Sequence, residues 1–406
     1  MDPHRLQWRA VSKAGRGTRS LFSKVPKAEA VMERVGRLAR RKLGARVVLG
    51  ADRLAMELHP AAKVALVAPA DGVLELTIDA AFVGPGLAGY VLAQVELLLH
   101  EVDFVWQADA EGDAVSSPRD AAALQRGFAA WVKEQVAARA QGGSRQIGIP
   151  QDPQSELAGA VLLPLGPRDE PWCQAVLADP EAARDGWPLW QPATEATLAL
   201  ARGLWHLWME VPWRAVTTDE DHALLARAHR ELAAAFRLDA SLPLPWAEWA
   251  ELVDQMDLDD EVTAEVRARG VDGTPVAGYR RHPARFAVNH GWSLLLPAHC
   301  TITRQDDADT LAAADGERSL RCTCAESTGE SAAAILAKIP MRSDVVERFD
   351  QGGQLGRIER REDEDYGVCV ATGIMTTEDH AAVLTVLALP GDDEWALAVW
   401  RSLRRA

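Results

Sequence analysis

The sequence lacks the signatures that identify most enzyme classes. It contains no GxSxG or SxxK nucleophile motif, no P-loop and no protein-kinase motif. No apolar run reaches the roughly 18 residues of a membrane helix, and the N-terminal MDPHRLQWRAVSKAGRG has no apolar signal core. The five cysteines are an odd number, and none occurs in the first 172 residues, as expected in a reducing compartment. We therefore expect a cytoplasmic, non-catalytic protein without a cofactor.

Charge is distributed unevenly along the chain. The net charge is −15, yet residues 1–46 contain thirteen Lys and Arg against three Asp and Glu, which gives +10 there and −25 elsewhere. A basic segment on an acidic body could bind nucleic acid or an anionic partner. No aromatic ladder or nucleic-acid motif accompanies it. We expect a solvated basic arm over residues 1–26, and neither nucleic acid nor a membrane as a partner.

A glycine-rich segment, FVGPGLAGYV, has the GxGxxG spacing of dinucleotide sites at Gly84, Gly86 and Gly89. The strand before it, LELTID, alternates apolar and polar residues, whereas the first strand of a dinucleotide fold is covered on both faces. Pro85 removes a backbone N–H from the loop, although Asp109 lies near the position of a ribose-binding acid. We interpret the glycines as a tight strand-to-helix turn.

The chain is long enough, at 406 residues, for two domains with separate cores. Residues 27–257 predict an α+β domain that begins with an amphipathic helix at Lys27. Extended segments follow at RVVLG, RLAMELH, KVALVA and GVLELTIDAAFV, the last two joined by the hairpin signal Asp71-Gly72. This order predicts an antiparallel meander followed by helices.

Tryptophans concentrate in the helical part of this domain, where eight of the chain's fourteen lie within 78 residues. Most of them can fill a core. Exposed ones would form a docking surface, because tryptophan is enriched in interface hot spots. The candidate binding residues are Trp205, Trp208, Trp213, Trp246 and Trp249.

The strongest candidate for chemistry is a polar stripe at i, i+4 and i+8 on an apolar helix, made by Arg202, His206 and Glu210. In a cleft, Glu210 could orient His206 for proton transfer near neutral pH, and Arg202 could bind an anion. The alternative is a stripe that faces solvent or forms a structural ion pair.

Metal-ligating patterns are weak. Cys322 and Cys324 project to one face of a strand, with Cys300 and Cys369 in neighbouring extended segments, so that four thiolates could bind zinc. Structural zinc sites usually take CxxC pairs from turns, and we expect these cysteines to pack in the core.

The histidines of the chain add no metal motif. His100 and Glu101, in HEVDF, lack the HExxH spacing that places two imidazoles on one helical face. His59 and His299 have no identifiable partner in the sequence. We expect none of these side chains to be a metal ligand.

Residues 258–284 are charged and rich in glycine, and we expect them to connect the two domains. Residues 285–406 predict strands at GWSLLLPA, ERSLRCTCAE, GQLGRIERRED, YGVCVATGIMT and HAAVLTVLALP, with helices at SAAAILAKI and DDEWALAVWRSLRR. The fold class is therefore α+β, with two mainly antiparallel sheets packed by helices.

The C-terminal third resembles the PsbP-like α/β/α sandwich superfamily. The resemblance depends on an opening strand at 292–297 that ends in proline, a closing meander, and a last helix that directs Trp395, Val399, Trp400 and Leu403 inward. That superfamily includes bacterial chaperones of type VI secretion effectors, and the resemblance implies a non-enzymatic binding scaffold. The remainder resembles uncharacterised bacterial proteins.

Two functional hypotheses follow. The first is a protein-binding adaptor, chaperone or immunity-type factor of a bacterial secretion or conflict system, whose partner is another protein such as a toxin or secretion component. The second is an enzyme or small-ligand-binding protein with a pocket around Arg202, His206 and Glu210.

Overall fold

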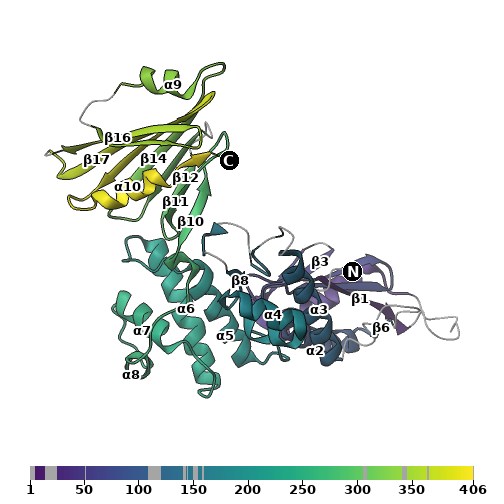
Figure 1. Ribbon diagram of the computed structural model, residues 1–406. Helices are drawn as coiled ribbons and strands as arrows, with labels where there is room; N and C mark the ends of the chain where they lie inside the picture. The colour runs from purple at the N-terminus through teal and green to yellow at the C-terminus, as the bar shows by residue number, and fades with distance from the viewer. Residues whose placement is uncertain are drawn as a thin grey trace. The chain divides into compact units, whose positions relative to one another are not determined.

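The computed structural model describes residues 5–13, 25–50, 52–107, 120–139, 143, 145–149, 154–157, 160–304, 309–340, 345–363 and 365–405. The chain forms two compact units. Unit 1 comprises Met1–Pro150, Ala158–Glu210 and Ala223–Ala277, and unit 2 comprises Gln151–Leu157, Val211–His222 and Gly278–Ala406. Both units contain antiparallel sheets with helices, which confirms the expected α+β class (Figure 1).

Unit 1 contains a six-stranded sheet in the order β2-β3-β4-β5-β1-β6, in which every pairing is antiparallel. The expected meander is β2 to β5, and its hairpin turns at Asp71-Gly72, where Gly72 has φ 74°. The strands are β1 (Arg5–Ser12), β2 (Val47–Leu49), β3 (Arg53–Met56), β4 (Lys63–Ala70), β5 (Val73–Asp79) and β6 (Phe104–Trp106).

The N-terminal segment differs from the basic arm expected over residues 1–26. Arg5–Ser12 forms β1, which pairs with β5 on one side and β6 on the other. Leu6 and Ala10 are buried, whereas the Arg9 side chain is 53% exposed. The period-two alternation of a strand was present in the sequence, but the high density of positive charge obscured it.

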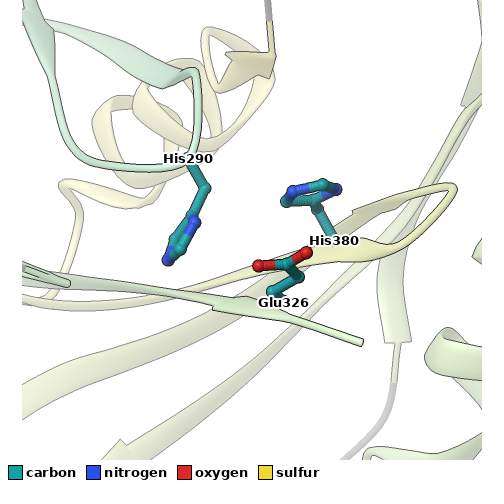
Figure 2. Close-up of side chains that lie close together, drawn as sticks. All are labelled: His290, Glu326 and His380. Atoms are coloured by element: carbon teal, nitrogen blue, oxygen red, sulfur yellow. The ribbon is translucent and has the colours of Figure 1, made fainter. Parts of the chain in front are cut away.

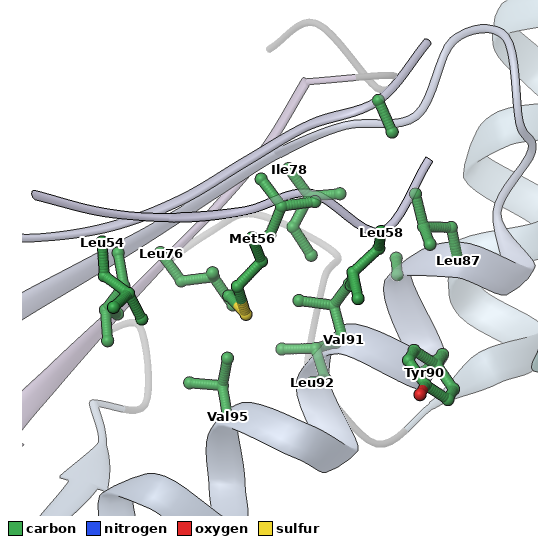
Figure 3. Close-up of a cluster of buried hydrophobic side chains, with 14 of the residues drawn as sticks. Leu54, Met56, Leu58, Leu76, Ile78, Leu87, Tyr90, Val91, Leu92 and Val95 are labelled. Atoms are coloured by element: carbon green, nitrogen blue, oxygen red, sulfur yellow. The ribbon is translucent and has the colours of Figure 1, made fainter. Parts of the chain in front are cut away.

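Helices α1 (Ala28–Leu43) and α2 (Gly86–Glu101) pack in the core of unit 1. Figure 3 shows the apolar side chains of the sheet meeting Leu87, Val91 and Val95 of α2. On β5 the residues Leu74, Leu76 and Ile78 are fully buried and the residues between them are half-buried, so the apolar alternation in the sequence gives the buried face of the strand.

The helical part of unit 1 continues into the segment expected to connect the domains. Helix α8 (Thr263–Gly270) packs against α7 (Trp246–Gln255), and Val262 and Val266 are buried. The backbone N–H groups of Val276 and Ala277 both donate to Glu248 on α7, at 2.8 Å. Residues 258–277 therefore belong to unit 1, because Thr263, Val266 and Gly270 recur at helical spacing and bury one side of α8. The helices that follow α2 along the chain are α3 (Ala121–Arg139), α4 (Glu170–Ala178), α5 (Glu195–Trp205), α6 (Asp219–Leu238), α7 (Trp246–Gln255) and α8 (Thr263–Gly270).

Shorter elements lie in both units. They are the hairpin of β8 (Val161–Leu163) and β9 (Gly166–Arg168), 3-10 turns at Gly44–Arg46, Pro180–Gly186 and Tyr279–Arg281, and a π-helical turn at His206–Glu210. No helix in the described residues is both long and apolar enough to cross a bilayer.

Unit 2 contains a seven-stranded antiparallel sheet in the order β12-β13-β14-β18-β17-β16-β15 and a four-stranded sheet in the order β19-β11-β10-β7. The expected opening strand, β11, lies in the smaller sheet. The elements are β7 (Gln154–Ser155), β10 (Pro283–Ala287), β11 (Trp292–Pro297), β12 (Thr301–Arg304), β13 (Thr310–Ala314), β14 (Ser319–Glu326), α9 (Ala332–Lys338), β15 (Val345–Gln351), β16 (Gln354–Asp363), β17 (Val368–Thr377), β18 (His380–Ala388), α10 (Asp393–Arg401) and β19 (Arg404–Arg405).

The last helix packs as the sequence predicted. Val399, Trp400 and Leu403 are buried in the core of unit 2, and Trp400 has no exposed surface. Trp395 is only half-buried, and the guanidinium of Arg318 lies 5.0 Å from its ring centre. The amphipathic spacing of α10 therefore identified its buried face.

Candidate functional site

The polar stripe expected at Arg202, His206 and Glu210 lies where α5 ends and a π-helical turn begins. Such turns are rare and are frequent at functional sites. Nδ1 of His206 lies 2.6 Å from Oε2 of Glu210, and Nε1 of Trp205 donates to Oε1 of the same carboxylate at 3.1 Å. The hydrogen bond from His206 holds the pKa of Glu210 below its usual value. Glu210 is therefore ionised at neutral pH and orients the imidazole.

Arg202 has a different partner. Its Nε donates to Oε2 of Glu231 on α6 at 2.7 Å, and its Nη1 donates to the carbonyl of Leu58 at 3.2 Å. The two side chains of this ion pair are 15% and 19% exposed. The stripe is thus divided into two polar pairs, and the guanidinium of Arg202 is held in one orientation.

Both pairs border a pocket of about 500 Å³ in unit 1, to which Arg202, His206 and Glu231 contribute. Strands β3 and β4, the loop between them, α5 and α6 supply the lining. Five of the lining side chains are cationic and two are anionic, which leaves an excess of three positive charges in a chain of net charge −15. The cationic residues are Arg53, Lys63, Arg202, Arg227 and Arg230, and the anionic ones are Glu57 and Glu231.

His59 also lines this pocket, although no partner could be identified for it from the sequence alone. The N–H of Ala61 donates to its Nδ1 at 3.1 Å, so Nε2 carries the proton and faces the carbonyl of Ala201 at 3.3 Å. Burial lowers the pKa of His59 to about 3, and Arg202 and His206 act in the same direction. His59 is therefore a neutral, fixed part of the wall and no source of protons at neutral pH.

The glycine-rich corner is a backbone crossing. The N–H of Gly84 donates to the carbonyl of Ala80, and the N–H of Gly86 donates to the carbonyl of Leu189, both at 2.8 Å. A Cβ on Gly86 would lie 1.8 Å from the carbonyl oxygen of Gln191. The amides that a phosphate would need are occupied by the chain itself, and the segment turns from β5 into α2 as expected. Asp109 lies outside the described residues.

The candidate tryptophans are mostly core residues, so the docking surface they would form is not present. Trp246 is half-buried, stacked on Trp249 at 5.6 Å, with the guanidinium of Arg269 4.6 Å from its ring centre. Large aromatic side chains supply more apolar area to a core than any others, and these tryptophans mostly fill the core. The remaining four are at most 9% exposed: Trp205, Trp208, Trp213 and Trp249.

The cysteines do not form the four-thiolate zinc site that the sequence left open. Cys300, Cys322, Cys324 and Cys369 are all buried, as core packing requires. Among the described residues, only Cys300 joins a group of potential metal ligands, with His299 and Asp315, whose donor atoms lie within 4.8 Å of one another. Burial raises the pKa of Cys300 to about 12. The thiolate form that metals bind is therefore strongly disfavoured in the free protein.

Two other histidine patterns have clear outcomes. His100 is exposed, and Glu101 pairs with Lys42 at 3.2 Å, so HEVDF forms no ligand cluster in the structure. The sequence did not indicate a second group of potential ligands, His290, Glu326 and His380. These residues are 36 and 54 positions apart along the chain, and no local spacing pattern could have brought them together.

Comparisons with known proteins add one likeness. No protein-family model matches the chain, and no curated protein matches it. Among solved structures, the chain is similar to cyanobacterial PsbP (CyanoP) from Synechocystis sp. PCC 6803, at 10% identity and a TM-score of 0.24. The match covers 30% of this chain and 91% of that chain.

Proposed function

We propose that the protein binds a small anionic ligand in the pocket lined by Arg202 and His206. The observation that carries this proposal is the excess of positive charge in the pocket of a strongly acidic protein. An acidic surface repels anions, so a cation-lined concavity is the place where an anion would concentrate. The proposal develops the second of the two hypotheses drawn from the sequence.

The size and chemistry of the pocket support a small molecule. A volume of about 500 Å³ falls within the range of about 300–1,000 Å³ typical of small-molecule sites. Four of its five cationic side chains are arginines, whose planar guanidinium matches the oxygen geometry of carboxylates and phosphates. A ligand with one or two phosphate or carboxylate groups fits this lining.

Arg202 and His206 would make the specific contacts. Arg202 is preorganised by Glu231 and the Leu58 carbonyl, so less conformational entropy is lost when it binds a ligand. With Nδ1 directed at Glu210, His206 keeps Nε2 for a hydrogen bond or a proton transfer. The exposed Arg53, Lys63 and Arg230 would add attraction that depends on salt.

The experiment is a calorimetric titration with pyrophosphate and with citrate at low and at physiological salt. We expect binding that weakens at least tenfold in Arg202→Gln and in the double variant Arg53→Gln/Arg230→Gln. The control is Arg126→Gln, since Arg126 is exposed on α3 and lies outside the pocket. Binding that is equal in all four proteins, or absent from the wild-type protein with both probes, would contradict the proposal.

The protein-binding role remains a prediction from the sequence resemblance. The tryptophans proposed as its binding residues are mostly buried, so a partner would have to use another surface. Affinity purification from the native cell tests the idea. A stoichiometric partner such as a toxin or secretion component would support an adaptor, and its absence beside a ligand retained in the pocket would argue against one.

A further inference from the structure

Unit 2 contains a second polar site, made by His290, Glu326 and His380. One nitrogen from each imidazole and one carboxylate oxygen lie within 4.8 Å of one another. Figure 2 shows the Glu326 carboxylate between the two rings. His290 and His380 are partly buried and Glu326 is exposed, so an ion can reach the group from solvent.

The fold fixes where each donor stands. Glu326 at the end of β14 and His380 at the start of β18 are direct partners in the antiparallel register, so their side chains lie on one face of the sheet. His290 comes from the turn between β10 and β11, where it has φ 51° and Gly291 has φ 77°. A left-handed conformation is uncommon for a residue other than glycine or asparagine, and here it presents an imidazole at this turn.

Each imidazole is oriented through its other nitrogen. Nε2 of His290 lies 3.2 Å from Oδ1 of Asp309, which leaves Nδ1 as its donor atom. Nδ1 of His380 lies 3.1 Å from the carbonyl oxygen of Glu378 and must therefore carry the proton, which leaves the lone pair of Nε2. Oxygen acceptors behind the histidines are the usual second layer of a metal site, because they fix the tautomer and raise ligand basicity.

A cation already occupies part of this group. Nη2 of Arg405 lies 3.1 Å from Nε2 of His380, and its Nε donates to the carbonyl of His290 at 2.9 Å. A guanidinium has only donors, so this contact also requires an unprotonated Nε2 on His380. Nε2 of His380 therefore already presents its lone pair to the positive charge of Arg405, and Arg405 would compete with any metal ion.

We propose that His290, Glu326 and His380 bind one Zn²⁺-like divalent ion, with Arg405 displaced and water in the fourth position. Two imidazoles and one carboxylate are typical ligands of Zn²⁺ in sites that keep an open position. Ca²⁺ and Mg²⁺ prefer oxygen ligands throughout and would bind far more weakly. The group of His299, Cys300 and Asp315 suits the ion less well, because none of its members is exposed, whereas Glu326 opens the proposed site to solvent.

The test is a calorimetric titration of the full chain with Zn²⁺, together with the visible spectrum of the Co²⁺ form. We expect one ion per chain and an affinity at least tenfold weaker in His380→Gln, Glu326→Gln and His290→Asn. Asparagine suits the left-handed turn, so His290→Asn removes the imidazole with little strain. The matched control is His222→Gln, which removes an exposed histidine of the same unit and should bind as the wild type does.

A second variant keeps the proposal falsifiable if the loss variants are unstable. Arg405→Gln removes the competing cation, and we expect it to tighten Zn²⁺ binding several-fold. Weaker or unchanged binding in Arg405→Gln would overturn the proposal. Binding that survives His380→Gln but is lost in Cys300→Ser would place the ion at the other group and would also overturn it, as would the absence of Zn²⁺ binding in both the wild-type protein and Arg405→Gln.

Discussion

Both units combine antiparallel sheets with helices, and they differ in the chemistry of their polar sites. The pocket of unit 1 concentrates cationic side chains, with Arg202 held by Glu231, and has the chemistry to receive an anion. The group in unit 2 concentrates electron-pair donors on His290 and His380 and has the chemistry to receive a cation. An architecture of antiparallel sheets and helices therefore does not determine which kind of ligand a unit can bind. The side chains at strand ends and on covering helices decide it.

One glycine in each unit makes a close contact, and the two contacts differ in kind. In unit 1, Gly86 lets one backbone cross another at the Gln191 carbonyl. In unit 2, Gly373 on β17 lets the ring of Trp400 lie directly on the sheet. Backbone cannot move without breaking hydrogen bonds, whereas a side chain can shift within its rotamer well. Substitution of Gly86 should therefore cost more than substitution of Gly373.

The largest expected effect is that of Gly86→Ala. The added Cβ would lie 1.8 Å from the Gln191 oxygen, and we expect a loss of at least about 3 kcal/mol in the free energy of unfolding. Chemical denaturation measures it. Gly89→Ala is the control. A Cβ on Gly89 would lie 3.5 Å from Pro192, which is an ordinary contact. Because Gly89 lies within helix α2, the substitution should stabilise the protein by about 0.5–1 kcal/mol. Equal effects of the two substitutions would show that the crossing is not tight.

The second effect concerns His59, the uncharged side chain in the wall of the unit 1 pocket, and is measured as the pH dependence of the free energy of unfolding. His59 has a folded pKa of about 3, below the unfolded value, so the unfolded chain binds more protons and stability falls as pH drops from 6.5 toward 3. At pH 4.5 this group alone should cost about 2–3 kcal/mol relative to neutral pH. In His59→Asn, which keeps an acceptor for the Ala61 N–H, the difference in stability between pH 7 and pH 4.5 should shrink by that amount.

Other groups also lose stability in acid, including Glu210, but they do so in both proteins. The comparison of wild type with His59→Asn therefore isolates the imidazole. If both proteins show the same pH dependence, His59 is accessible to protons, and the rigid wall assigned to it is wrong.

The smallest of the three effects is Gly373→Ala in unit 2. The Cβ would lie 2.2 Å from Cδ1 of Trp400, and we expect a cost of about 2 kcal/mol as the ring shifts. The double variant Gly373→Ala/Trp400→Phe should recover part of the free energy of unfolding that the clash removes. A double-mutant cycle measures this coupling between the two positions. Strict additivity of the two substitutions would mean that the ring does not press on Gly373.

Local patterns predicted much of the fold. Alternation in LELTID gave β5 and its buried face, Asp71-Gly72 gave the hairpin, and the spacing of Val399, Trp400 and Leu403 gave the buried side of α10. The same reasoning missed β1, because charge density in the first 46 residues outweighed a short alternation. It also missed α8, whose few apolar residues lie among many charges.

The candidate sites were less predictable. Helical spacing brought His206 to Glu210, since residues four apart share a helix face. It could not show that Arg202 pairs with Glu231, 29 positions away, or that Arg53 and Lys63 line the same pocket. The tryptophans indicated a large core for most of them and left open a docking surface for some, because burial depends on neighbours that no local pattern identifies.

The sequence by itself determined which segments extend, which coil and which face of each is apolar, because these depend on side chains within a few residues of one another. Only the tertiary structure decided that cations from strands and helices surround one pocket, and that two histidines and a glutamate converge at the end of a sheet. Those encounters join residues tens or hundreds of positions apart, and their geometry is set by the packing of whole elements rather than by any local spacing.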